Sequence, residues 1–211
     1  MKIGYSVEGS TDRAFISGLK LRWCRNAIMI EGRFRGSTGQ SRRREIAKIC
    51  LELSHKGAEL ITFLSDSNSD GPNAWRKVAQ DEESRVPVQY SHYVIIGICQ
   101  RNVECWLCTD ADWIAKRYNR STEEFRVSNP KGIFNTALGI SYRDTKEDEI
   151  AELVMQAPLH RWLHNKSFEA FYDKLWLYSK KSGCTIENLR EGKVPEGSYK
   201  RPRSKKQAHR R

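Results

Sequence analysis

The sequence contains no apolar run long enough to cross a lipid bilayer, a span that requires about 20 consecutive apolar residues. Residues 1–7 have the pattern of a strand and lack the charged start and long apolar run of a secretory signal peptide. We therefore expect a cytoplasmic protein without a membrane partner. Thiols stay reduced in that compartment, so reduced side chains are expected for all six cysteines: Cys24, Cys50, Cys99, Cys105, Cys108 and Cys184.

Three motifs that would identify a site are incomplete. Cys105 and Cys108 have CxxC spacing, but no second CxxC or histidine pair supplies the four ligands that zinc usually takes. His160 and His164 lack the glutamate of the HExxH motif. The glycine-rich loop 32–40 lacks the Gly-Lys-Ser/Thr ending of a phosphate-binding loop. We therefore interpret these cysteines and histidines as packing or surface residues and exclude the nucleotide-binding interpretation of the loop.

Acidic residues are in deficit. The chain has 37 Lys and Arg against 26 Asp and Glu, a formal net charge of +11 at pH 7. Nucleic acid is the favoured partner, because Lys and Arg contacts to phosphates supply most non-specific affinity; the alternative is a tail that only aids solubility. Residues 183–211 carry nine basic residues against three Glu, and residues 200–211 contain no acid and no large apolar side chain. We expect 183–211 to be a disordered basic tail.

Basic residues of the loop and tail are the expected nucleic-acid contacts. For the cluster at 42–44, a solvated helix face is the alternative interpretation. The assigned residues are Arg33, Arg35, Arg42, Arg43, Lys200, Arg201, Arg203, Lys205 and Lys206.

Short apolar strands alternate with helical patterns in the first half of the chain. The helix that starts at Ser41, for example, carries Ile46, Ile49 and Leu53 at helical spacing. This alternation predicts an α/β fold with a mostly parallel four-stranded sheet flanked by helices. Strands are expected at residues 2–7, 26–30, 58–64 and 93–99, and helices at 10–21, from 41, and between the last two strands.

The pattern beyond residue 103 is helical. Helices are expected at 103–118, 147–156 and 167–180. Core positions are expected for Trp106, Trp113, Trp162 and Trp176. We divide the chain into an α/β core at 1–120, a helical C-terminal extension at 121–182 and the basic tail at 183–211.

Three acidic residues follow predicted strands. Glu8 comes directly after the first strand, and Asp66 and Asp70 come after the third. Ligands of parallel α/β sheets bind at the carboxyl ends of the strands, and Mg²⁺ takes one or two carboxylates together with waters and substrate phosphate. The sequence therefore predicts a Mg²⁺ or Mn²⁺ site here. The structural alternative makes Glu8 a helix-terminal acid and the aspartates ordinary turn residues.

The segments around these acids resemble a known fold family. Residues 7–12 (Val-Glu-Gly-Ser-Thr-Asp) and 63–70 (Phe-Leu-Ser-Asp-Ser-Asn-Ser-Asp) resemble the TOPRIM fold of topoisomerases, primases and overcoming-lysogenization-defect nucleases. Residues 101–110 resemble the glutamate-tryptophan-aspartate segment of a TOPRIM-like family of unknown function, found in bacteria and often beside ATPases. Residues 129–131 and 167–171 are similar to later parts of that family, so the resemblance extends to about residue 180.

The resemblance implies a metal-dependent nuclease that cuts DNA or RNA. It implies acid–base or metal-binding work for Glu8, metal binding for Asp66, a further metal ligand at Glu104 and a downstream catalytic lysine at Lys131. Asp110, six residues after Glu104 on a predicted helix, would lie on another side and is not assigned. The resemblance also implies an effector of bacterial anti-phage defence with a partner ATPase.

The chain departs from the TOPRIM pattern at its metal-binding pair. The usual Asp-x-Asp is replaced by Asp66-x-Asn68-x-Asp70, in which Asn68 offers only a neutral oxygen and Asp70 must reach further. We expect this change to weaken or abolish metal binding. A second hypothesis is therefore a non-catalytic TOPRIM-like module that binds nucleic acid or a partner ATPase, and a third is an effector held inactive by a partner.

Overall fold

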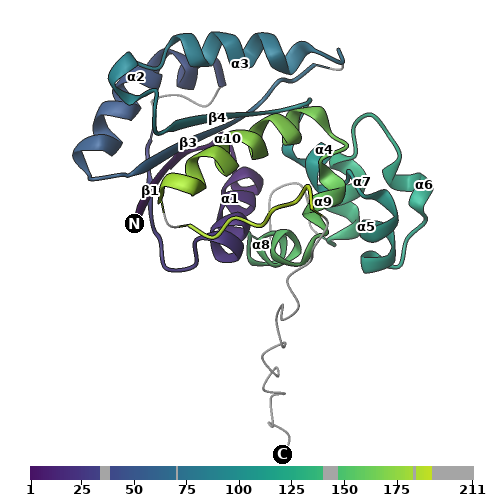
Figure 1. Ribbon diagram of the computed structural model, residues 1–211. Helices are drawn as coiled ribbons and strands as arrows, with labels where there is room; N and C mark the ends of the chain where they lie inside the picture. Colours follow the sequence, from purple (N-terminus) through teal and green to yellow (C-terminus); the bar gives the residue numbers. More distant parts are fainter. Residues whose placement is uncertain (34–38, 70, 140–146, 183, 192–211) are drawn as a thin grey trace, which may run out of the picture.

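In the part of the chain that the structure describes, four parallel strands form one sheet. The computed structural model describes residues 1–33, 39–69, 71–139, 147–182 and 184–191. The strands are β1 (Lys2–Ser6), β2 (Ile28–Glu31), β3 (Leu60–Asp66) and β4 (Val94–Cys99), in the order β2-β1-β3-β4 (Figure 1). The predicted α/β fold with a parallel sheet flanked by helices is confirmed.

Helices cover both faces of the sheet, which explains why its central strands are continuous apolar runs. On one face lie α2 (Gly39–His55) and α3 (Ala74–Ser84), packed against Ile61 and Phe63 of β3. On the other face, Leu60 and Leu64 of the same strand join a second buried cluster. The helices that contribute to that cluster include α1 (Ser10–Trp23), α8 (Glu147–Gln156) and α10 (Lys166–Ser182).

The helix predicted at 103–118 is wrong in one respect: two helices occupy the segment. Asp110 accepts a hydrogen bond from the backbone N–H of Trp113 at 3.2 Å and so starts a second helix. Asn102 caps the first helix by accepting from the N–H of Cys105. The remaining helices are α4 (Val103–Leu107), α5 (Ala111–Tyr118), α6 (Thr122–Phe125), α7 (Lys131–Ala137), α9 (Leu159–Trp162) and the 3₁₀ turn η1 (Val88–Tyr90).

An aromatic cluster joins the first and last parts of the chain. Trp106 and Trp162 are fully buried, as predicted, and Phe168 packs against both with ring centroids 5.4 Å apart. The indole of Trp106 donates a hydrogen bond to Ser167 Oγ at 2.6 Å. Trp113 and Trp176 are only partly buried at the edge of the cluster. The helical extension thus shares its hydrophobic core with the α/β part.

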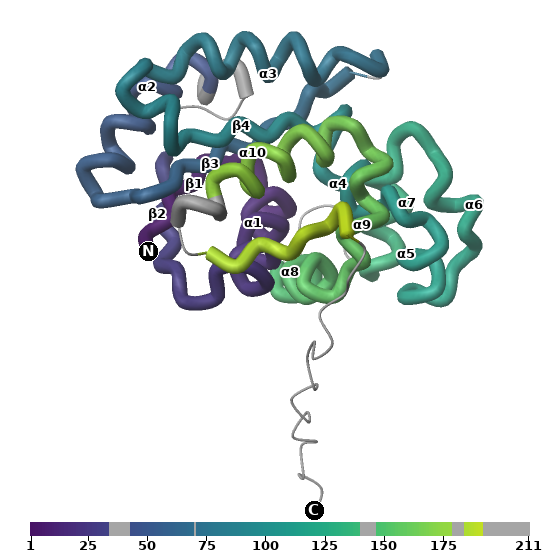
Figure 2. Tube along the Cα trace, in the orientation of Figure 1, coloured from purple at the N-terminus to yellow at the C-terminus, as the bar shows by residue number. Residues whose placement is uncertain are grey.

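Residues 184–191 do not behave as the start of a loose tail. Ile186 and Leu189 are buried against the body of the protein, and Arg22 holds Glu187 through two hydrogen bonds of 2.6 Å. Figure 2 shows this segment running beside α1 and α8 toward α9. The predicted tail boundary at 183 is therefore wrong, because two apolar side chains and one ion pair fasten the segment. Residues 192–211 lie outside the described residues.

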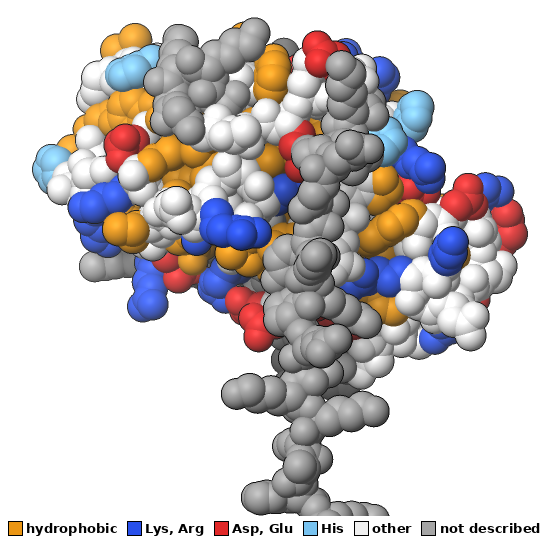
Figure 3. Space-filling model, turned by 60° about the horizontal axis from the view of Figure 1, so that its bottom comes forward, with side chains coloured by type: hydrophobic (Ala, Val, Ile, Leu, Met, Phe, Trp, Pro, Cys, Tyr) orange, Lys and Arg blue, Asp and Glu red, His pale blue; other side chains and the backbone are white. Residues whose placement is uncertain are grey.

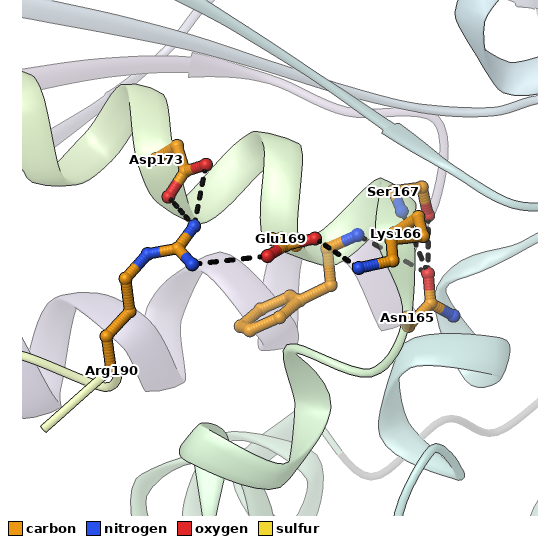
Figure 4. Close-up of polar contacts among 7 residues, drawn as sticks. Asn165, Lys166, Ser167, Glu169, Asp173 and Arg190 are labelled. Atoms are coloured by element: carbon orange, nitrogen blue, oxygen red, sulfur yellow. Dashed lines mark hydrogen bonds and ion pairs between the residues drawn. The ribbon is translucent and has the colours of Figure 1, made fainter. Parts of the chain in front are cut away.

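Figure 4 shows further contacts that hold residues 184–191 against the body of the protein. Arg190 reaches across α10 to Asp173, at 2.7 and 2.9 Å, and to Glu169, at 3.3 Å. At the start of α10, Asn165 accepts hydrogen bonds from the backbone N–H and the hydroxyl of Ser167. These contacts fix both the beginning of α10 and the segment that returns along it.

The expectation of six reduced cysteines is also wrong. Cys24, after α1, and Cys184, after α10, form a disulfide with a Cα–Cα distance of 5.3 Å across 160 residues of sequence. The expectation came from cell compartment alone, which carries no information about where the fold places two cysteines. The other four cysteines are free thiols, and burial raises the pKa of the Cys50 thiol to about 12. No helix in the described ranges is long and apolar enough to span a membrane.

We predict that reduction of the disulfide destabilises the protein by about 2–5 kcal/mol, because the closed loop restricts the unfolded chain. This corresponds to a fall in melting temperature of roughly 5–15 °C. Thermal unfolding with and without a phosphine reductant measures the difference. Cys24→Ser should melt at the lower temperature in both buffers, whereas Cys105→Ser should keep the wild-type response. Equal melting temperatures for the wild type in the two buffers would contradict the prediction.

Candidate metal centre

Two acidic residues lie where β1 turns into α1. Glu8 is half-buried and follows β1 by two residues. Asp12, in the first turn of α1, is only 5% exposed and accepts a hydrogen bond from the N–H of Gly9 at 2.9 Å. This bond satisfies a helix-terminal donor and fixes the entry into α1. Both acids therefore stand at the turn that joins β1 to α1.

Asp66 is the last residue of β3, beside β1 in the sheet. Side chains alternate along the strand, so Asp66 lies on the same face as Leu64, the face that α1 covers. Its Oδ1 atom is buried and has no hydrogen-bond partner among the described residues. A buried carboxylate oxygen without a donor is costly, and it marks this position as one where a cation would be stabilising.

Glu104 belongs to the segment that follows β4, the strand next to β3 in the sheet. It lies in the first turn of α4, five residues after the end of β4, and is 2% exposed. Lys131, at the start of α7, places its Nζ 3.9 Å from Glu104 Oε1. Burial raises the pKa of Glu104, and the charge of Lys131 acts in the opposite direction.

The charges of these residues all act on the pKa of Asp66. The pKa of Asp66 is raised from 3.8 to about 8, first by burial and then by the negative charges of Asp12, Glu8 and Glu104, in that order. Lys131 lowers it. Asp66 therefore holds a proton at neutral pH, and a cation that enters the cluster would displace that proton.

The structure brings together the predicted residues Glu8, Asp66, Glu104 and Lys131. It adds Asp12, which sequence reasoning missed, although its position four residues after Glu8 at a helix start was a usable signal. The fifth predicted residue, Asp70, lies outside the described residues.

Two further residues near the cluster have local roles. Asn68, at the departure from Asp-x-Asp, is exposed and has a φ of 52°, a left-handed conformation that asparagine tolerates better than most residues. Its N–H donates to the carbonyl of Arg101 at 3.0 Å. Asp110 caps α5 and forms an ion pair with Arg161 at 3.0 Å, so it serves the helical extension and not the cluster.

The predicted nucleic-acid contacts have mixed outcomes. Arg33 is 87% exposed, whereas Arg43 lies 3.3 Å from Oε1 of the fully buried Glu82. Ser65 donates to the same oxygen at 2.7 Å, so Arg43 neutralises a buried carboxylate and is not displayed for a partner. On the face in Figure 3, described Lys and Arg side chains are mixed with acidic and apolar ones and form no continuous patch. Outside the described side chains lie Arg35, Arg42, Lys200, Arg201, Arg203, Lys205 and Lys206.

The cluster suits a hard divalent ion in chemistry and charge. All its donors are carboxylate oxygens, the class that Mg²⁺ and Mn²⁺ prefer. Within the described ranges, no three His, Cys, Asp or Glu side chains stand close enough to hold an ion together. Mg²⁺ commonly uses only one or two carboxylates and completes its shell with water and phosphate. The residues therefore fit such an ion. Among them, Asp66 would gain most from it, because its buried Oδ1 atom has no hydrogen-bond partner among the described residues.

Comparison of the chain with protein-family models, with curated proteins and with solved structures gives no match. The arrangement of the site itself therefore carries the functional argument.

We predict that Asp66→Asn stabilises the metal-free protein at pH 8 and leaves stability unchanged near pH 4. The folded state keeps the Asp66 proton up to about pH 8, whereas the unfolded chain loses it near pH 4. Wild-type stability therefore falls as the pH rises through this window, and asparagine, which does not ionise, removes the loss. We expect a gain of about 2–4 kcal/mol at pH 8. Urea unfolding in EDTA at both pH values measures it, and an equal effect at the two would contradict the prediction.

Proposed function

We propose that the chain is a TOPRIM-like, metal-dependent nuclease that hydrolyses phosphodiester bonds of DNA or RNA. The observation that carries the proposal is the gathering of Glu8, Asp12, Asp66 and Glu104 at the carboxyl ends of three neighbouring strands, with Lys131 beside them. A parallel four-stranded sheet with acids at this edge agrees with the TOPRIM resemblance of residues 7–12 and 63–70.

The side chains divide the work by position. Asp66 and Glu8 would hold Mg²⁺ or Mn²⁺, with Glu104 and Asp70 as further ligands. The ion supplies neutralisation of phosphate charge and a more acidic water. Glu8, half-buried at the rim, would accept the proton of the attacking water, and Lys131 would hold a phosphate oxygen. Hydrolysis places the water hydroxyl on phosphorus, breaks one P–O bond and returns a proton to the leaving oxygen.

The resemblance to a TOPRIM-like family found beside ATPases supports a wider setting. In this extension of the proposal, the chain is the nucleolytic effector of an anti-phage system and works with a partner ATPase. The basic residues at 200–211 add affinity for nucleic acid at any sequence.

A second candidate function is a non-catalytic TOPRIM-like module that binds nucleic acid or the ATPase. Two observations favour it: Asn68 replaces the second aspartate and is exposed, and no three potential ligands in the described ranges meet at one point. In that case the acidic residues would have no catalytic role. An assay of nucleic-acid cleavage with Mg²⁺ or Mn²⁺ distinguishes the two functions, because only the nuclease would cut.

We predict that the wild type cleaves nucleic acid with Mn²⁺ or Mg²⁺ and that Glu8→Gln and Asp66→Asn each reduce the rate at least about 100-fold. Single-stranded and duplex DNA and RNA are incubated with the full chain, and products are resolved on denaturing gels. Circular dichroism confirms that the variants fold.

Glu123→Gln is the matched control, because Glu123 lies in α6, is 75% exposed and forms an ion pair with Arg126 at 2.8 Å. It should cleave at the wild-type rate. Cleavage that is unchanged in Glu8→Gln and Asp66→Asn would reject the proposed site. A wild type that binds these substrates but cuts none of them with either metal would establish the binding module instead.

A further inference from the structure

A cavity of about 600 Å³ opens beside the carboxylate cluster. It lies between the start of α3, the loop after β4, α4 and the loop that leads into α10, and its volume is in the range of about 300–1,000 Å³ typical of ligand pockets. Cys105 lines it. Burial is the main cause of the raised pKa of this thiol, and the charges of Glu104, Arg101 and Asp66 also act on it. The cavity therefore adjoins the candidate metal centre.

The charge of the cavity is opposite to that of the cluster. Four basic side chains line it, and none of the described residues around it is acidic. Lys166 is committed to Glu169 at 2.9 Å, as Figure 4 shows. Arg76 is exposed, and its only described partner is the ring of Trp75, with the guanidinium carbon 5.3 Å from the ring centroid. The lining bases are Arg76, Arg101, His164 and Lys166.

Arg101 has an unusual backbone conformation. Its φ is 69°, which costs a residue with a Cβ about 1–2 kcal/mol. Hydrogen bonds to the loop after β3 maintain it: its N–H donates to Ser67 Oγ at 2.7 Å, and its carbonyl accepts from Asn68 at 3.0 Å. Strain of this kind is typical of functional sites. Here the strained turn places the arginine in the wall of the cavity.

Part of the cavity lining is apolar. Phe125, Val127 and Pro130 line it, and Val127 is 42% exposed, high for a side chain of its type. A cavity lined by both cationic and apolar side chains suits a nucleotide, which carries an anionic phosphate and a flat, largely apolar base.

We propose that this cavity binds the sugar–phosphate backbone of a single nucleic-acid strand next to the bond that the carboxylates cut. Arg76 and Arg101 pair with a phosphate of the flanking nucleotide, and its base packs against Phe125 and Val127. The identity of the strand as substrate rests on the proposed nuclease function, whereas binding in the cavity requires no cleavage. The cations of the cavity thus hold an anion against a cluster that would otherwise repel it.

The test measures binding of a fluorescent single-stranded DNA of about 20 nucleotides to the full chain in EDTA, by anisotropy over a range of salt concentrations. Arg76→Ala and Arg101→Gly should each weaken binding about 5- to 10-fold and reduce the salt slope by about 1. Glycine suits the positive φ, and the melting temperature of Arg101→Gly, measured beside that of the wild type, shows that the variant is folded. Loss of binding in this variant therefore cannot come from unfolding.

Lys77→Ala is the matched control, since Lys77 is the exposed neighbour of Arg76 on α3 and does not line the cavity. It removes the same formal charge and should change affinity less than 2-fold. Equal effects of Lys77→Ala and Arg76→Ala would overturn the proposal and leave general attraction to a basic chain. Displacement of the strand by inorganic phosphate at an equal phosphate concentration would also overturn it, because the cavity would then be a small-anion site. Binding without metal separates this outcome from a failure of the cleavage assay.

Discussion

Like charges held together at the buried end of a parallel sheet are the constraint on which the site depends. Asp66 ends β3, and Glu8 and Asp12 flank the turn from β1 into α1. Burial of Asp66, together with repulsion from these charges, raises its pKa to about 8 and keeps a proton on it at neutral pH. A neutral residue in place of one of these acids would remove the repulsion and stabilise the metal-free protein. A bound cation in place of the proton would offset this destabilisation, because its positive charge neutralises the carboxylates.

The packing beneath the cluster holds these carboxylates in place. A Cβ atom at Gly97 of β4 would come within 2.6 Å of the Phe171 ring, so α10 can lie close to the strand only at a glycine. Gly18 plays the same part between α1 and α8, where a Cβ would meet Val154 at 2.6 Å. Close packing at these two glycines therefore fixes α10 against β4 and α8 against α1. A rigid frame of this kind maintains repulsion that flexible segments would relieve.

Sequence patterns predicted what depends on local chemistry and buried strands. The apolar runs before Asp66 and Gln100 indicated parallel strands, and acids at strand ends indicated a shared edge. Asp12 was missed because a helix-starting aspartate has an ordinary capping role. The break before Ala111 was missed because the side chain of Asp110 decides it, against a continuous apolar periodicity. The Cys24–Cys184 bond could not be predicted, since it depends on where α1 and α10 end in space.

Calorimetric titration of Mn²⁺ into the wild type at pH 7, in two buffers of different ionisation enthalpy, tests the metal centre most directly. If an ion displaces the Asp66 proton, the binding enthalpy should differ between the two buffers. Divided by the difference in their ionisation enthalpies, it should give a release of nearly one proton for each ion bound. Asp66→Asn should lose this release together with most of the affinity. Binding without proton release, or equal binding by the variant, would contradict the assignment of Asp66 as the residue that receives the cation.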